Sequence, residues 1–176
     1  MGVKGTGMES SARLVARDRW PYLMAVGGVL LLDRASKVVI GNAYQPGESR
    51  TVVGGFFDLV HLHNPGVAFG LFSGSESVLK VVLLSSVAIA AVVAVVFYSL
   101  RSPASHRLLQ VSLALILGGA LGNLYDRISQ GYVVDFLSFH IGRFYWPAFN
   151  AADTAISIGV AGLALVVIQD EIRARS

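Results

Sequence analysis

Two carboxylates stand in apolar stretches of the C-terminal half of the chain, Asp135 in "GYVVDF" and Asp153 in "FNAADTAI". An acid has no propensity reason to lie in a run of β-branched and aromatic residues, and it is costly to place beside hydrocarbon. Two carboxylates held together at a low-dielectric boundary tend to share one proton. One can then act as a base toward water and the other as an acid toward a peptide carbonyl. This is the chemistry of aspartic proteases, which needs no metal, serine or cysteine.

Each acid also has a structural interpretation that the residues leave open. Asn150 as a helix N-cap, with Asp153 at the third helical position, resembles a capping box with a shortened acid. Asp135 could be a solvated residue at the edge of a sheet.

Other ionisable residues fit structural roles better than catalytic ones. Asp33 and Lys37 are spaced i, i+4 with the acid first, which predicts an ion pair within one helix. Arg34 should point elsewhere and reach toward the interface. Asp126 and Arg127 are adjacent, so on a helix they diverge by about 100° and need different partners.

Other catalytic chemistries have weaker support. There is no G-x-S-x-G motif, and the chain has no cysteine that could act as a nucleophile, metal ligand or disulfide partner. A Ser-Lys pair using Lys37 or Lys80 would place its nucleophile in a helix with a structural role. His61 and His63 share a strand face without a third ligand at a recognisable spacing, so we expect no metal site.

The elements that must position these residues are membrane helices. The 176 residues are 54% apolar with a mean hydropathy of +0.63, which is more hydrophobic than an ordinary soluble domain. A helix of about 20 apolar residues crosses a bilayer. Four stretches are long enough: Trp20 to Ile40, Val78 to Leu100, Leu108 to Tyr125 and Ala151 to Ile168.

The distribution of lysine and arginine predicts the orientation. One side carries Lys4, Arg13, Arg17, Arg19, Arg101, Arg107, Arg173 and Arg175, and the other carries only Arg50, Arg127 and Arg143. Both termini should therefore be cytoplasmic, and Asp135 and Asp153 should lie on one outer connection at similar depth. The net charge of +3 belongs mostly to the cytoplasmic flanks, which suits an anionic leaflet and not a nucleic acid.

The two outer connections have strand patterns. Residues 57–63 alternate, with Phe57, Leu59, His61 and His63 expected on one side, before the turn residues of "NPG" and the segment "VAFGLF". Residues 130–146 are rich in β-branched and aromatic residues. We expect an α-helical membrane protein with four transmembrane helices, a small extracytoplasmic β-sheet cap and both termini cytoplasmic, in one domain spanning 1–176, of which 1–7 could be a vector-derived leader. Gly118 and Gly122 should permit close helix approach.

Four motifs in this order resemble those of lipoprotein signal peptidase, the type II signal peptidase of bacteria: "DRASK", "NPGVAFG", "GGALGNLYDR" with "GYVVDF", and "FNAADTAI". The resemblance runs from about Trp20 to Ile168. One departure is Arg34, where the family usually has a glutamine.

The resemblance implies a role for each site residue. Asp135 and Asp153 would be the catalytic pair. The substrate-binding and orienting residues would be Asn64, Gly66, Asn123, Arg127 and Asn150. The supporting residues would be Asp33, Lys37 and Asp126.

The resemblance also implies a membrane aspartic endopeptidase without metal or cofactor. Its substrate would be a prolipoprotein bearing a diacylglyceryl group, cut just before the lipidated cysteine, with membrane lipids as surroundings and globomycin as an inhibitor. The site would lie near the extracytoplasmic face of the bacterial inner membrane, covered by the sheet and the Asn64 loop. Two other functions remain open: a proton-coupled transporter relaying protons through Asp33, Asp126 and Asp153, and a non-catalytic module that binds lipidated peptides.

Overall fold

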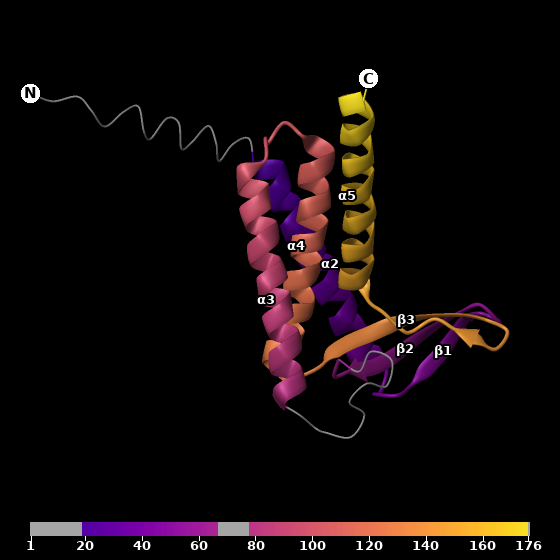
Figure 1. The fold of residues 1–176 in the computed structure, drawn as a ribbon. Coiled ribbons are helices and arrows are strands. Elements are labelled where there is room, and N and C mark those ends of the chain that lie inside the picture. Colours follow the sequence, from indigo (N-terminus) through magenta and orange to yellow (C-terminus); the bar gives the residue numbers. More distant parts are fainter. Residues whose placement is uncertain (1–18, 67–77, 176) are drawn as a thin grey trace, which may run out of the picture.

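Four long helices form a bundle in the computed structural model, which describes residues 19–66 and 78–175 (Figure 1). They are α2 (Trp20–Ala43), α3 (Val78–Arg101), α4 (Arg107–Gln130) and α5 (Ala151–Arg175). All four apolar stretches predicted from the sequence are helical. The last two helices run beyond the predicted ends, so that Asp126 and Arg127 lie on α4 itself.

Three of these helices are long and apolar enough to cross a membrane: α3 from Val81, α4 and α5. The α2 helix has 24 residues, a sufficient length, but its second half contains Asp33, Arg34 and Lys37. The structure therefore supports a membrane protein with three candidate spanning helices among its described residues.

The central helix is α4, which packs against α2, α3 and α5. Its glycines allow this contact: a Cβ at Gly118 would come within 2.7 Å of the Val29 side chain, and one at Gly119 within 2.4 Å of the Ala152 carbonyl oxygen. A Cβ at Gly122 would come within 2.6 Å of an Asp33 oxygen. The prediction of close helix approach at Gly118 and Gly122 is confirmed.

A four-stranded antiparallel sheet lies at the end of the bundle away from the C-terminus and extends sideways below α5 (Figure 1). Its strands follow chain order: β1 (Ser49–Val53), β2 (Phe57–Asn64), β3 (Val133–Ile141) and β4 (Phe144–Tyr145). Both outer connections thus form strands, as predicted. Residues 67–77, which include all of "VAFGLF", lie outside the described residues.

The register of β2 against β3 shifts between Leu59 and Leu62. Their partners on β3, Leu137 and Asp135, are two residues apart and share a face of the sheet. Leu59 and Leu62 therefore share a face although they are three residues apart, which is the effect of a β-bulge. The strict alternation predicted for this strand is wrong. The bulge brings Asn64 onto the face that carries Asp135.

The sheet is joined to the bundle by an apolar cluster at its inner end. Ile40 of α2 packs with Val134 and Phe136, the two neighbours of Asp135 on β3. Tyr44 and Ala151 border the same cluster. Because both neighbours of Asp135 are anchored to the helices, its carboxylate is held at the junction of sheet and bundle.

Candidate active site

Asp135 and Asp153 come together at the junction between β3 and the start of α5, and Asn150 connects them. The Asn150 Nδ2 group donates to Asp135 Oδ1 at 2.7 Å, and its Oδ1 accepts from the Asp153 backbone N–H at 3.0 Å. Asn150 is completely buried. One side chain therefore sets the position of both acids.

Asp153 lies in the first turn of α5 and caps it. Its Oδ2 accepts from the Asn150 backbone N–H at 3.3 Å, which completes the reciprocal bonding of a capping box. Its other oxygen, Oδ1, accepts from Asn123 Nδ2 of α4 at 2.7 Å. The capping interpretation is therefore confirmed, and it does not compete with a chemical role because the cap itself fixes the carboxylate.

Asp135 is not a solvated edge residue, because it is only 3% exposed and β3 is an inner strand. Its two oxygens accept from Asn150 and from Asn64, the latter at 2.8 Å. Its pKa is raised to about 6, chiefly by burial and also by the nearby Asp153, although the amide donors of Asn64 and Asn150 and the charge of Lys37 partly oppose the shift. Asp135 therefore retains its proton to a higher pH than an ordinary aspartate does.

The orientation of the Asn64 amide is determined by the turn that follows. Its Oδ1 accepts from the Gly66 backbone N–H at 2.8 Å, so its Nδ2 must face Asp135. Gly66 has a φ of +91°, and a Cβ there would overlap Leu84 of α3. Glycine is therefore required at this position by conformation and by space.

Arg127 approaches the same carboxylates from α4. Its guanidinium interacts electrostatically with Asp153 and Asp135, and its Nη1 donates to the Asn123 carbonyl at 3.4 Å. Its buried Nε makes no hydrogen bond with the described residues. As predicted, Arg127 and Asp126 turn to different partners.

A buried ion cluster supports the site from the α2 side. Lys37 Nζ donates to Asp33 Oδ2 at 2.8 Å and to Asn123 Oδ1 at 3.1 Å, and it forms an ion pair with Asp126 Oδ2 at 2.7 Å. The predicted Asp33–Lys37 pair is confirmed. Arg34, which was expected to point away from this pair, joins the same cluster. It pairs with Asp126 and lies over the Tyr125 ring, so the cluster contains two cations and two anions.

The ion cluster is joined to the two aspartates by contacts that sequence reasoning missed. Lys37 and Asn150 both donate to Asn123 Oδ1, which leaves the Asn123 Nδ2 group facing Asp153. Asp33 Oδ1 accepts from the Ala152 backbone N–H at 3.0 Å, at the start of α5. No sequence signal identifies these contacts, because their partners lie between 27 and 119 positions apart.

His61 and His63 lie together on β2, close to Asn64. Their Nε2 atoms are 3.2 Å apart, and His61 Nδ1 bonds the Tyr44 carbonyl at 2.7 Å. His63 stacks on Tyr132, and burial together with His61 lowers its pKa. No group of three His, Asp or Glu side chains in residues 19–66 and 78–175 has the arrangement of a metal site.

The fold and the site define a helical membrane protein in which two aspartates are held together at the end of the bundle by asparagine side chains. A family model described as Signal peptidase (SPase) II matches residues 25–169. The chain belongs to this family, which is a family of proteases.

Named relatives and solved structures agree with this family. The chain is 43% identical over 150 residues to the lipoprotein signal peptidase of Syntrophus aciditrophicus, covering 85% of this chain and 93% of the relative. It is 41% identical over 144 residues to that of Francisella tularensis subsp. novicida, covering 82% and 89%. A bacterial membrane enzyme determined by the in meso method at 2.3 Å superimposes with a TM-score of 0.75 at 29% identity, covering 86% of this chain and 89% of the other.

Proposed function

We propose that this protein is the membrane aspartic endopeptidase that removes signal peptides from prolipoproteins, with Asp135 and Asp153 as its catalytic pair. The observation that carries the proposal is the connection of a buried aspartate to a helix-capping aspartate through the buried Asn150 amide. Family membership supplies the substrate class.

The surroundings suit the two aspartates to different roles. Asp135 is buried with a raised pKa, so it holds the shared proton. Asp153 accepts two N–H donors, from Asn123 and Asn150, at the positive end of the α5 dipole. These contacts fix the Asp153 carboxylate in place, and we assign it the role of the base.

In the reaction, Asp153 removes a proton from a water molecule as its oxygen attacks the scissile carbonyl carbon, and Asp135 gives its proton to the carbonyl oxygen. When the tetrahedral intermediate collapses, Asp153 passes the proton it took from water to the leaving nitrogen, the C–N bond breaks, and the hydroxyl on the former carbonyl carbon returns its proton to Asp135. Arg127 interacts with both carboxylates and would bind the substrate backbone through its guanidinium. Asn64, Gly66, Asn123 and Asn150 position the pair and the adjoining substrate backbone, while Asp33, Lys37 and Asp126 support them.

The membrane sets the position of the substrate. All four helices cross the inner membrane, since the charges of α2 are paired within the bundle. The arginines at the end opposite the sheet favour cytoplasmic termini and place the pair at the extracytoplasmic face. Acyl chains of a diacylglyceryl cysteine, held in the bilayer, then bring the preceding peptide bond to the depth of the aspartates. Globomycin, as a peptide inhibitor, competes for this position.

The test is a gel-shift cleavage assay of the purified protein in lipid, with a diacylglyceryl-modified prolipoprotein and its unlipidated form. Wild type is compared with Asp135→Asn and Asp153→Asn. Asp170→Asn serves as the matched control, because this exposed acid lies at the far end of α5. We expect cleavage of the lipidated form alone, with the first two variants inactive but folded and the control fully active. Normal cleavage by either variant would refute the catalytic pair.

A further inference from the structure

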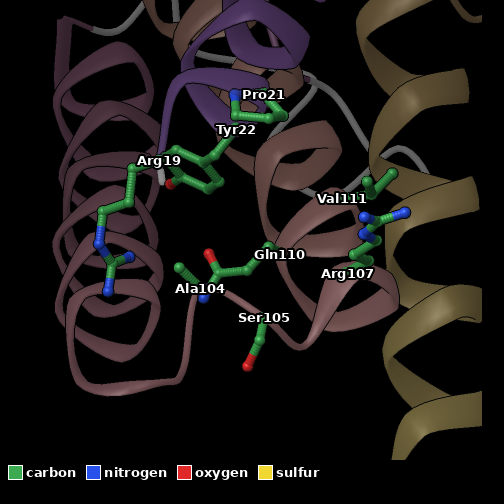
Figure 2. A pocket seen from close by; sticks show the side chains of 8 residues that line it. All are labelled: Arg19, Pro21, Tyr22, Ala104, Ser105, Arg107, Gln110 and Val111. Carbon is green, nitrogen blue, oxygen red and sulfur yellow. The ribbon is translucent and has the colours of Figure 1, made fainter. Parts of the chain in front are cut away.

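A cavity lies at the end of the bundle opposite the aspartates, where α2 and α4 begin and α3 ends (Figure 2). Its volume is about 610 Å³, within the range of small-molecule sites. It is lined by Arg19, Pro21, Tyr22, Ala104, Ser105, Arg107, Gln110 and Val111. None of the contacts described for the active site reaches it.

The walls of this cavity are held by hydrogen bonds. Arg19 donates to the carbonyls of Ser99 and Leu100 at the end of α3 and to that of Ser102 just after it. Gln110 is buried and donates to the carbonyls of Ser99 and Ser102, at 3.3 and 3.4 Å. Hydrogen bonds therefore fix the shape of the cavity at the junction between α2, α3 and α4.

The cavity is strongly basic. Figure 2 shows Arg19 and Arg107 on opposite sides, with Gln110 and Ala104 between them. No aspartate or glutamate is among the lining residues. Arg19 bonds only to uncharged oxygens, and the side chain of Arg107 has no hydrogen bond or ion pair with the described residues, so no carboxylate there neutralises either charge. The first turn of α4 adds the positive end of its dipole.

The cavity is also amphipathic, which indicates the source of its ligand. Pro21, Tyr22 and Val111 form apolar parts of the lining, and Val111 is 47% exposed. Trp20, at the start of α2, is 62% exposed, as is usual for an indole at a membrane interface. A free phosphate needs only the arginines, whereas a phospholipid needs arginines beside an apolar surface at the ends of spanning helices.

We propose that this cavity binds the phosphodiester headgroup of an anionic glycerophospholipid. Arg107 supplies the unpaired guanidinium, which can donate two parallel hydrogen bonds to phosphate oxygens. Ser105 contributes a hydroxyl, and the acyl chains run along the exposed surface of α4 and α2. The site is independent of peptide cleavage and lies at the other end of the bundle.

The test is native mass spectrometry of the full-length protein in detergent, titrated with phosphatidylglycerol or phosphatidylcholine of identical acyl chains. Arg107→Gln removes the unpaired cation, and Ala104→Trp fills the cavity while keeping both arginines. The matched control is Arg101→Gln, which removes the same charge from the same end of the bundle but from a residue that stacks on Phe97 outside the cavity.

We expect wild type to retain one phosphatidylglycerol in preference to phosphatidylcholine. Both cavity variants should lose at least about tenfold in affinity, as for a lost charge-assisted bond, while the control binds as wild type does. If Arg101→Gln and Arg107→Gln lose the same affinity for phosphatidylglycerol, the binding depends only on the general surface charge, and the proposal is overturned. Displacement of the lipid by millimolar inorganic phosphate would overturn the lipid assignment in favour of a free anion.

Discussion

The proton held by Asp135 should make the stability of this protein depend on pH in a way that one substitution removes. The pKa of Asp135 is raised from 3.8 to about 6 by burial, and the residue is 3% exposed. Between these values the native state keeps a proton that the unfolded chain has lost. The free energy of unfolding therefore falls as pH rises from 3.8 to about 6 and levels off above it.

The size of this effect follows from the same values. A rise from 3.8 to about 6 corresponds to about 3 kcal/mol. The side chain introduced by Asp135→Asn cannot ionise, so the free energy of unfolding of this variant should not show this fall with rising pH. The new amide would direct one N–H group at the Asn64 or Asn150 donor, which costs about 1–3 kcal/mol at every pH. Relative to wild type, the variant should therefore gain about 3 kcal/mol between pH 3.5 and pH 7.5.

The assay is reversible unfolding in mixed detergent micelles, with wild type, Asp135→Asn and the Asp170→Asn control at several pH values. The pH-independent cost of the amide cancels in the difference between the two ends of the range. Asp153→Asn should move the transition of Asp135 to lower pH, because Asp153 raises that pKa. If the difference between wild type and Asp135→Asn does not change with pH, the reasoning from burial is wrong.

Three further predictions test other parts of the structure. The kcat/KM of prolipoprotein cleavage should fall as pH rises past about 6, because the pair then loses the proton held by Asp135. A kcat/KM that stays constant up to about pH 9 would show that this proton is not needed for catalysis. Lys37→Met should cost about 3–5 kcal/mol in thermal unfolding, because two buried carboxylates lose their shared cation, and a cost near zero would show that these ion pairs do not stabilise the fold. Gly119→Ala should lower the free energy of unfolding by about 1–3 kcal/mol, because the added Cβ would push Ala152 away. Gly27→Ala has nothing within 4 Å of the added Cβ, so it should be neutral or slightly stabilising. Equal effects of the two substitutions on thermal unfolding would exclude close packing as the reason for glycine at position 119.

The sequence by itself determined the features that depend on neighbours along the chain. Apolar length located the four helices, and β-branched and aromatic runs located both strand regions. The i, i+4 spacing of Asp33 and Lys37 and the spacing of Asn150 and Asp153 predicted contacts within one or two helical turns. Such contacts form wherever the local helix forms, so spacing is enough to predict them.

Only the tertiary structure decided which of these polar groups meet and which are buried. A single extra residue between Leu59 and Leu62 brings Asn64, and not His63, to the face of Asp135. Packing of β3 against α2 makes Asp135 a buried acid and not a solvated one. A strand's register and an acid's burial depend on partners far away in the chain, and no spacing within the strand records them.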